Sequence, residues 1–306
     1  MNPDLAVETR GLTRLYGRKR ALDGLDMALP RGGIHAVVGA NGAGKSTLFK
    51  LLLGFQTADA GDCFVLGRRA DALTQADRAR IGFVNEEHTL PGWARVDTVL
   101  AVQRELYRDR WSAQSFDSLI GSFDLSGRQR VSQLSRGERA GLNLALALGQ
   151  SPELLILDEP TLGLDVVARR RLLDALIAAV SDEARTILYC SHQIEEVERL
   201  ADTLLILERG RLASYSAPDA FRDRIGHWLA DVPFKGPAKD EVPGLLQHRQ
   251  IDGVHHYIVI DQGEAFAEFL RAHGARKPQV MPVPLERAVD AFLTRNHAGT
   301  TPRASL

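Results

Sequence analysis

Cysteine and long apolar runs are both scarce in this chain. It has only 2 cysteines in 306 residues. Cys63 and Cys190 form no disulfide framework and no metal-ligand spacing, so we expect buried free thiols in a reducing compartment. No apolar run approaches the roughly 18 residues that a membrane-spanning helix needs. The first residues include an acid and lack an apolar stretch, which argues against a signal peptide. We therefore expect a cytoplasmic protein whose membrane role, if it has one, requires a separate chain.

An excess of charge of one sign is also missing. The chain has 38 Lys and Arg against 39 Asp and Glu, for a formal net charge of −1. This balance provides no general attraction to nucleic acid or to anionic lipid. The basic clusters at residues 14–20 and 169–171 are interpreted as solvated surface. A hydrophobic content of 44% and a charged content of 25% are ordinary for a globular protein, and the length suggests about two domains.

Residues 39–47, Gly-Ala-Asn-Gly-Ala-Gly-Lys-Ser-Thr, fit the phosphate-loop pattern G-x-x-x-x-G-K-[ST] at every fixed position. An apolar run precedes this segment and a helix-like stretch follows it. Glycines let the backbone approach phosphates, and the following helix offers its positive N-terminal end to an anion. Lys45 should reach the β- and γ-phosphates of ATP, and the Ser46 hydroxyl should bind Mg²⁺. The predicted ATP-binding residues of this loop are Asn41, Gly42, Ala43, Gly44, Lys45, Ser46 and Thr47.

A second motif places two carboxylates after a short apolar run. Residues 154–157 are fully apolar, as expected for a central parallel strand, and Asp158-Glu159-Pro160 follows them. Ligands bind at the carboxyl ends of such strands, and adjacent strand residues point in opposite directions. We expect Asp158 to join the Mg²⁺ shell and Glu159 to act as the catalytic group that polarises the attacking water.

With these motifs the chain resembles the ATP-binding-cassette (ABC) family, specifically the nucleotide-binding subunit of a transporter, over roughly residues 4–220. Residues 134–139, Leu-Ser-Arg-Gly-Glu-Arg, are similar to the family's signature motif. The resemblance implies that Ser135 and Gly137 meet the γ-phosphate of an ATP bound by the opposite subunit. Generic phosphate-loop kinases and small GTPases lack this motif and are disfavoured.

Three more positions match the family in order. Tyr16 lies where the family stacks an aromatic ring on adenine. Residues 161–165, Thr-Leu-Gly-Leu-Asp, look like the D-loop, so Asp165 is expected at a dimer interface beside ATP. His192 follows a strand and looks like the switch histidine, which implies a catalytic role together with Glu159 and Lys45.

Two positions depart from the family pattern. Residues 81–87 are similar to the segment that the family calls its lid, and Glu86 occupies the position where the lid usually has glutamine. Glu86 is still predicted to bind Mg²⁺, with a changed coupling between nucleotide and partner. Arg136 stands in the signature motif where glycine is common. An acidic lid and a basic signature look like those of the ABC-2-type exporter ATPases. The acidic lid also allows a subunit that binds ATP without fast turnover.

The resemblance implies an α/β fold: a P-loop NTPase ABC cassette with a RecA-like core, an antiparallel β subdomain and a helical signature subdomain at about residues 95–150. We expect the nucleotide-binding domain to cover residues 1–221 and a small C-terminal α+β domain to cover residues 222–306. In the latter, patterning predicts strands at 255–260 and 279–283 and helices at 264–273 and 285–294. Its histidines show no metal-ligand spacing, and we predict no metal site there.

One chain has one phosphate loop and one signature motif, so the resemblance implies a head-to-tail dimer that encloses two ATP molecules. The partner is a second copy or a related cassette subunit. The region around Trp93 is where the family docks a transmembrane permease, which would hold the chain at the inner face of the cell membrane. The function predicted is therefore an Mg²⁺-dependent ATP hydrolase subunit of an exporter. The alternative is a soluble cassette ATPase of an assembly system, of the iron–sulfur-assembly type.

Overall fold

The structure, a computed structural model, describes residues 3–121, 123, 125–180, 185–231 and 236–295. The chain divides into two compact units, Met1–Tyr215 and Ser216–Leu306, and each is described by itself. The boundary expected after residue 221 differs, because it falls inside helix α8 (Pro218–Asp223), which belongs to the second unit. The Phe221 ring of α8 packs edge-on against Phe292 of the second unit at 5.4 Å between centroids, which accounts for the shift.

The first unit is built on a six-stranded sheet. The phosphate loop and the acid pair lie at the ends of two of its strands, at the same edge. The order of the sheet is β10-β9-β3-β8-β7-β6, and β6, β7, β8, β3 and β9 pair in parallel. The five parallel strands are apolar and largely buried because both faces of the sheet are covered there. Their bounds are β3 (Ile34–Val38), β6 (Ile81–Val84), β7 (Leu154–Asp158), β8 (Thr186–Cys190), β9 (Thr203–Glu208) and β10 (Arg211–Ser216).

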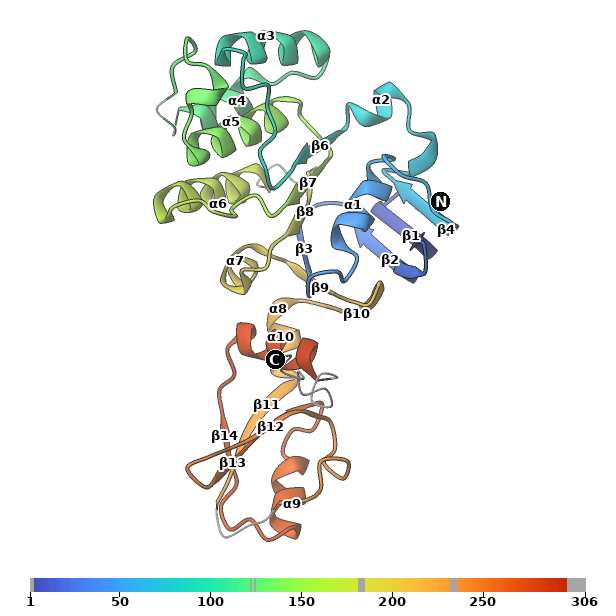
Figure 1. Cartoon of the computed structure of the whole chain (residues 1–306), viewed down its shortest axis with the longest axis vertical. Helices are drawn as coiled ribbons and strands as arrows, with labels where there is room; N and C mark the ends of the chain where they lie inside the picture. Colours follow the sequence, from blue (N-terminus) through green and yellow to red (C-terminus); the bar gives the residue numbers. More distant parts are fainter. Residues whose placement is uncertain (1–2, 122, 124, 181–184, 232–235, 296–306) are drawn as a thin grey trace, which may run out of the picture. The chain divides into compact units, whose positions relative to one another are not determined.

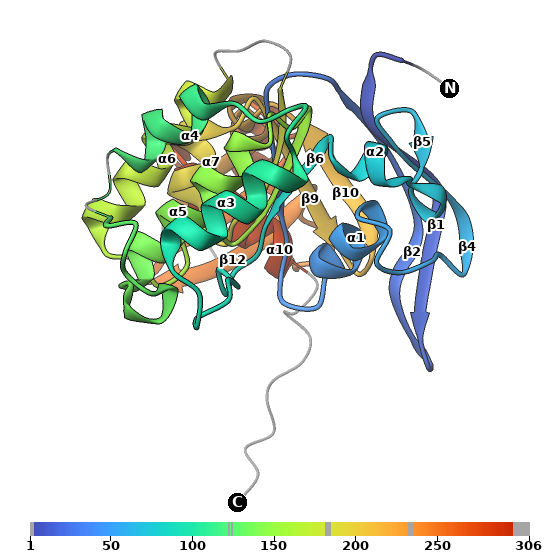
Figure 2. The ribbon, with the colours of Figure 1, turned by 90° about the horizontal axis from the view of Figure 1, so that it is seen from above.

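Each face of this sheet has its own hydrophobic core. Side chains of β7 such as Leu155 and Leu157 pack with the helical segment that contains α3 (Val96–Leu106), α4 (Ala113–Ile120), α5 (Arg136–Gly149) and α6 (Val166–Val180). Leu154 and Ile156 of the same strand pack on the other side with α1 (Lys45–Leu52). Figures 1 and 2 show α3 to α6 on one side of the strands and α1 on the other. The shorter helices of this unit are α2 (Gln75–Arg78) and α7 (Ile194–Leu200).

The segment at residues 142–148, whose sequence fits either a helix or a strand, lies in helix α5. Alternating leucines at 142–148 also fit a strand, but the segment is helical and buried on nearly every side. A helix that is apolar all round lies in a core. Gly141 and Gly149 make the packing possible, because a Cβ at either position would lie 2.6 Å from a ring of Phe123 or Trp111.

A four-stranded antiparallel sheet completes the first unit beside α1, in the order β2-β1-β4-β5. Its apolar face joins the core on the α1 side of the parallel sheet. The strands are β1 (Leu5–Tyr16), β2 (Lys19–Pro30), β4 (Ala60–Val65) and β5 (Arg68–Arg69). Cys63 of β4 and Cys190 of β8 are buried free thiols, as predicted.

The second unit is a four-stranded antiparallel sheet with helices, which confirms the predicted α+β class. Its order is β12-β13-β11-β14. The sequence predicted β13 (Val254–Ile260), α9 (Ala265–Ala272), β14 (Gln279–Met281) and α10 (Leu285–Thr294). It missed β11 (Ile225–Ala230) and β12 (Leu245–Ile251), which flank β13 in the sheet.

Four histidines of the second unit form two separate pairs. His248 Nε2 lies 3.1 Å from His255 Nδ1, and His227 Nε2 lies 3.1 Å from His256 Nδ1. His255 and His256 are neighbours on β13, so the two pairs lie on opposite faces of the sheet. Within the part of the chain that the structure describes, no group of three or more His, Cys, Asp or Glu could hold a metal ion.

Glu153, just before β7, joins three arginines from separate segments. It accepts hydrogen bonds from Arg80 Nε at 2.6 Å and from Arg80 Nη2 at 2.7 Å. Arg31 Nη1 donates to it at 3.0 Å, and Arg110 lies 3.6 Å away. The Arg80 hydrogen bonds lower the pKa of Glu153 from 4.5 to about 2. The carboxylate thus fixes the starts of β3, β6 and β7.

Glu153→Gln should lower the free energy of unfolding by about 2 kcal/mol near neutral pH, because charge-assisted hydrogen bonds are lost. A lowered carboxyl pKa stabilises the fold fully above pH 4.5, and this contribution is lost as pH falls toward about 2. Urea unfolding of both proteins over this range should show the gap narrowing with acid. Glu105→Gln, which removes an exposed partner of Arg108, is the control and should be nearly neutral. A gap that stays constant with pH would contradict the prediction.

Candidate nucleotide-binding site

A hollow of about 280 Å³ in the first unit contains most of the residues predicted to bind ATP. Four segments form it: the β1–β2 turn, the phosphate loop with the start of α1, the lid after β6, and the end of β7. Its lining residues are Tyr16, Lys19, Ala21, Asn41, Gly42, Gly44, Lys45, Ser46, Thr47, Glu86, Asp158 and Glu159. Residues from distant parts of the sequence therefore meet at the carboxyl edge of the parallel sheet, where ligands bind in such folds.

The phosphate loop leaves β3 and turns into α1 at Lys45, with Gly44 as the N-cap in a left-handed conformation at φ 112. A Cβ at Gly44 would lie 2.5 Å from the Ala21 carbonyl oxygen, so glycine is required for packing as well as for backbone conformation. Lys45 Nζ donates to the Gly39 carbonyl at 2.6 Å. The ammonium group thus lies inside the loop at the N-terminus of α1, where the helix dipole also favours anions.

Ala43 is the one predicted loop residue that does not line the hollow. Its side chain is buried in the core, and its backbone N–H donates to the Ala40 carbonyl at 3.0 Å. The Gly210 N–H donates to the Ala43 carbonyl at 2.9 Å. Both backbone groups of Ala43 therefore hold the shape of the loop.

Lys19 lines the hollow, and the sequence interpretation missed it by treating residues 14–20 as solvated surface. A Cβ built on Gly42 would lie 3.5 Å from Lys19 Nζ, so this ammonium group stands over the phosphate loop. The Tyr16 ring lies beside it, 42% exposed, with its hydroxyl donating to Gln56 Oε1 at 2.5 Å. The Arg14 guanidinium lies 5.2 Å from the ring centroid. Lys19 directly follows the Gly17-Arg18 turn, and this closeness to Tyr16 was the signal in the sequence that could have identified Lys19 as a site residue.

Glu159 and His192 lie together at the ends of neighbouring parallel strands. His192 Nδ1 is 2.7 Å from Glu159 Oε2, and the His192 backbone N–H donates to the same oxygen at 3.2 Å. Glu159 has a left-handed backbone at φ 51, which is strained for a residue with a side chain. Its own N–H donates to the Cys190 carbonyl at 3.0 Å, which ties the two strand ends together. This left-handed turn directs Glu159 away from the strand path that Asp158 follows.

The acids beside the phosphate loop suit a cation bound with the nucleotide. Burial raises the pKa of Asp158, and the nearby carboxylates of Glu159 and Glu86 raise it further. A bound cation would relieve this repulsion. Ser46 and Glu86 line the same hollow and supply further oxygen atoms. Mg²⁺ with nucleotides commonly takes only one or two protein ligands, with phosphates and waters completing its shell, so these residues fit such an ion.

The signature motif and the D-loop of the same chain contact each other but do not line this hollow. Ser135 caps α5: its hydroxyl accepts from the Glu138 N–H at 3.2 Å, and its own N–H donates to the Glu138 carboxylate at 2.7 Å. A Cβ at Gly137 would lie 2.7 Å from the Ala168 Cβ. Asp165 Oδ1 accepts from the Ala168 N–H at 2.9 Å at the start of α6. Exposed signature residues thus stand at a helix N-terminus, fixed against the D-loop.

The two departures from the family pattern line one further hollow of about 350 Å³, which contains Glu86, Glu87, His88, Arg136 and Arg139. Burial, with the guanidinium groups of Arg136 and Arg139 nearby, lowers the pKa of His88 to about 4, so this imidazole is neutral at physiological pH. An acidic lid and a basic signature helix therefore face the same space.

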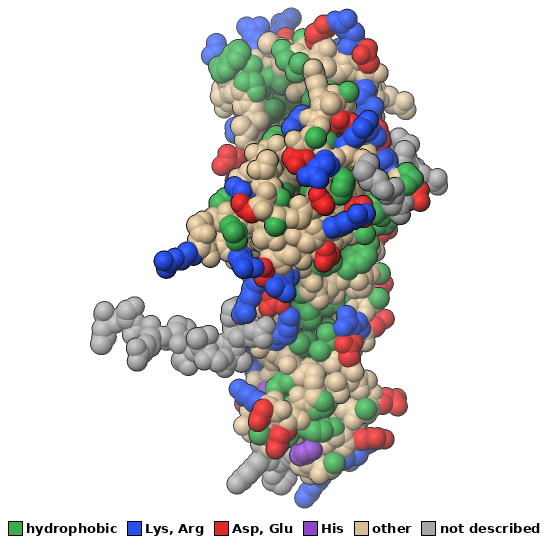
Figure 3. Space-filling view, turned by 90° about the vertical axis from the view of Figure 1, so that its right-hand side faces the viewer, with side chains coloured by type: hydrophobic (Ala, Val, Ile, Leu, Met, Phe, Trp, Pro, Cys, Tyr) green, Lys and Arg blue, Asp and Glu red, His purple; other side chains and the backbone are tan. Residues whose placement is uncertain are grey.

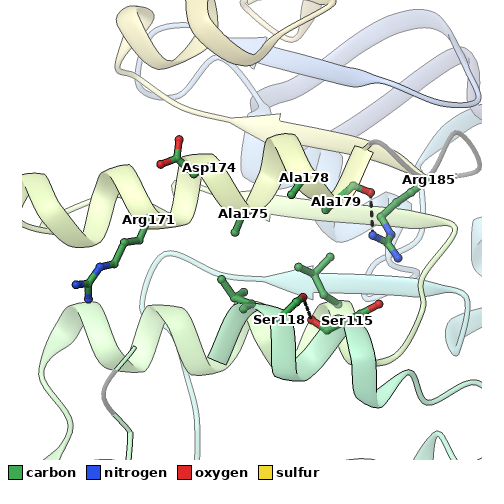
Figure 4. A pocket seen from close by; sticks show the side chains of 10 residues that line it. Ser115, Ser118, Arg171, Asp174, Ala175, Ala178, Ala179 and Arg185 are labelled. Carbon is green, nitrogen blue, oxygen red and sulfur yellow. Dashed lines mark hydrogen bonds between the residues drawn. The ribbon is translucent and has the colours of Figure 1, made fainter. Parts of the chain in front are cut away.

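A third hollow, of about 400 Å³, lies between α4 and α6 (Figure 4). Small residues form much of it, including Ser115, Ser118 and Ala175, and Ser118 donates to the Ser115 carbonyl. Arg185 at its end donates to the Ala179 carbonyl at 2.9 Å. None of its lining residues belongs to the motifs above, so it is separate from the phosphate-binding chemistry.

A phosphate loop at a helix N-terminus, with paired acids at the end of another parallel strand of the same sheet, defines a phosphate-loop nucleotide hydrolase. The family model described as "ABC transporter" matches residues 22–162. The Nod factor export ATP-binding protein I of Burkholderia orbicola (strain AU 1054) is 30% identical over 294 residues, covering 94% of this chain and 95% of that protein. The chain therefore belongs to the ABC transporter family and is an ATP-binding cassette ATPase.

Other comparisons agree. The daunorubicin resistance ATP-binding protein DrrA3 of Streptomyces coeruleorubidus is 35% identical over 233 residues, covering 75% of this chain and 73% of that protein. The ATP-binding subunit of an ABC transporter has the same fold, with a TM-score of 0.63 at 24% identity over 71% of this chain and 92% of that one. An ATP-bound bacterial Atm1-family ABC exporter matches with a TM-score of 0.62 at 27% identity, covering 72% of this chain and 40% of that one.

Gly44→Ala should weaken the binding of ADP at least about tenfold, because the new Cβ would meet the Ala21 carbonyl 2.5 Å away and displace the phosphate loop. Isothermal titration of the full chain measures the affinity. Gly24→Ala is the matched control: Gly24 also has a positive φ, of +67°, but nothing lies within 4 Å of a Cβ there. The control should lose some stability and keep its affinity, and equal affinities in all three proteins would contradict the prediction.

Proposed function

We propose that this chain is the ATP-hydrolysing subunit of an exporter of the ABC-2 type, and that it couples ATP-driven closure of a cassette dimer to a separate membrane permease. The observation with the greatest weight is the meeting of Lys45, Asp158 and Glu159 in one hollow, with His192 hydrogen-bonded to Glu159. The names of the relatives, a Nod factor export protein and a daunorubicin resistance protein, favour an exporter.

Each side chain has a distinct task in this proposal. Lys45 exchanges its loop carbonyl partners for the β- and γ-phosphates of ATP, and Tyr16 offers its exposed ring to the adenine. Ser46, Asp158 and Glu86 hold Mg²⁺, which neutralises charge on the phosphates when it is bound. Glu159 orients and polarises the attacking water. His192, hydrogen-bonded to Glu159, holds that carboxylate in place.

The location of the signature residues supports a site completed by a second cassette. Ser135 and Asp165 are exposed at helix N-termini, and neither lines the hollow of its own chain. Backbone N–H groups at a helix N-terminus suit a phosphate. A head-to-tail partner, a second copy or a related cassette, would bring its Ser135 and Gly137 to the γ-phosphate and enclose the nucleotide. In this proposal the two subunits close on each other when ATP is bound, and hydrolysis of ATP lets them open again.

Glu159→Gln tests the hydrolytic role. The amide cannot act as a base, so turnover should fall by the ~10²–10⁴-fold typical of general-base loss while ATP affinity is kept. Steady-state phosphate release measures the first quantity, and gel filtration with ATP should reveal accumulating dimer. Lys45→Ala is the contrasting variant, because it should lose productive phosphate binding itself. Unchanged turnover in Glu159→Gln would remove Glu159 from this role.

Large apolar side chains are exposed on the segment that follows the lid. Trp93 is 78% exposed, and Val102 and Leu106 on α3 are 53% and 61% exposed. Isolated apolar side chains on a surface are common, but an exposed tryptophan followed by exposed aliphatic side chains on the next helix suits a protein interface. None of the described helices is long and apolar enough to cross a membrane. The proposed partner at this surface is a separate permease, which would hold the chain at the inner face of the cell membrane.

Nucleic acid is not a proposed partner. On the face of the first unit drawn in Figure 3, acidic and basic side chains are interspersed and no basic stripe stands out. The formal net charge of −1 agrees with this distribution.

Co-purification from native membranes should recover this chain with a multi-span membrane protein, and Trp93→Ser should weaken that association. Loss of a large interface anchor typically costs about 2 kcal/mol or more of binding free energy. Ile177→Ser, which changes an apolar residue 43% exposed on α6, is the control and should leave the complex intact. Recovery of a soluble scaffold protein in place of a membrane chain would favour the assembly ATPase instead.

A further inference from the structure

Glu196 on α7 is a buried carboxylate to which neither the sequence motifs nor the chemistry above gives a role. Its residue is only 4% exposed. A buried carboxylate is costly unless donors and cations compensate it, so its partners explain why it is tolerated.

Three hydroxyl groups converge on one oxygen of this carboxylate. Thr161 Oγ1 donates to Glu196 Oε2 at 2.9 Å, Ser191 Oγ donates to it at 3.0 Å, and the Tyr189 hydroxyl donates to it as well. All three donors are buried. Burial and the adjacent Glu196 raise the pKa of Tyr189 well above its usual value, so the phenol keeps the proton that it donates.

Two of these donors belong to the loops that hold the catalytic pair, and Tyr189 lies in β8. Thr161 follows Glu159 and Pro160 at the end of β7, and Ser191 directly precedes His192 at the end of β8. Ser191 Oγ also accepts from the Gln193 N–H at 3.0 Å, which fixes the other side of His192. One carboxylate oxygen thus joins the backbone next to Glu159 to the backbone next to His192.

The other oxygen of Glu196 connects this cluster to the D-loop. Arg169 Nε lies 3.6 Å from Glu196 Oε1. Arg169 is in the first turn of α6, where its N–H donates to the Asp165 carbonyl at 2.9 Å. The basic cluster at residues 169–171 was interpreted as solvated surface, and for Arg169 that interpretation is wrong: its side chain is paired with a buried acid.

We infer that Glu196 is a positioning residue: it fastens the Glu159 loop, the His192 loop and the start of α6 to one another, and so keeps Glu159 and His192 within hydrogen-bond distance. The inference rests on the proposed roles of these two residues. Without the carboxylate, three buried hydroxyl groups lose their acceptor, and each would seek a new partner by moving its loop. Because Glu196 does not line the nucleotide hollow, its loss should affect turnover and spare nucleotide binding.

Glu196→Gln in the full chain tests this inference through kcat and nucleotide affinity measured separately. The uncharged amide is a weaker acceptor, so kcat should fall about tenfold or more while the Kd for ATP changes less than about twofold. Glu195→Gln is the matched control, since Glu195 is the preceding residue of the same helix and is exposed. It should match the wild type in both quantities.

The double variant Glu196→Gln/His192→Ala decides whether Glu196 acts through the catalytic pair. If it does, the double variant should be no slower than His192→Ala alone, because coupled residues are not additive. The inference would be overturned if Glu196→Gln lowered kcat by the same factor in the wild type and in His192→Ala, or if Glu196→Gln alone kept the wild-type kcat. Either result would leave the proposed function standing. A wild-type kcat in His192→Ala would overturn the role of His192 and this inference together.

Thermal melting shows whether Glu196→Gln remains folded. If it does not, Ser191→Ala takes its place, since it removes the hydroxyl that donates to Glu196 and accepts from the Gln193 N–H, and leaves the carboxylate with its other two donors. Its kcat should then fall about two- to tenfold with ATP affinity retained, and a wild-type kcat would overturn the inference.

Discussion

The parallel pairing of β7 with β8 is the constraint on which the site depends. Asp158 and Cys190 are register partners, so the residues that follow each strand emerge side by side. This register places Glu159 against His192 and allows the Glu159 N–H to bond to the Cys190 carbonyl. A slip by one residue would turn the side chains of one strand to the opposite face and separate these groups. The buried leucines on both faces of β7 fix the register, so the hydrophobic core determines the geometry of the pair proposed to be catalytic.

Features set by short-range chemistry could be predicted from the sequence. The phosphate loop requires glycine where its backbone approaches Ala21, and the acid motif requires an apolar strand before it. Both requirements produce a fixed spacing of residue types along the chain. The phosphate loop, the two acids and the strand before His192 could therefore be predicted from the sequence alone. The helical nature of α5 needed an argument about close packing, because leucine alternation alone also fits a strand.

Features set by tertiary contacts could not be predicted in this way. Lys19 and Arg169 both lie in clusters of basic residues, and only the fold separates them from solvated neighbours: one reaches the phosphate loop and the other a buried carboxylate. Glu196 has the sequence context of an ordinary acidic helix start, beside the exposed Glu195. In the second unit, β12 lies at a sheet edge and is polar at residues 247–250, so it lacks the apolar run that identified β13.

The two departures from the family pattern, an acidic lid residue and a basic signature residue, lie in one part of the structure. Glu86 and Arg136 are far apart in the sequence, yet they line the same hollow together with Glu87 and Arg139. The negative charge of Glu86 on the lid and the positive charge of Arg136 at the start of the signature helix therefore face the same space. The imidazole of His88, which lines this space as well, is neutral and adds no charge. Glu86 also lines the nucleotide hollow, so it belongs to both spaces. Any change in charge at the nucleotide therefore acts on the same carboxylate that faces Arg136, which links the nucleotide hollow to the start of the signature helix, the surface proposed to meet a second cassette.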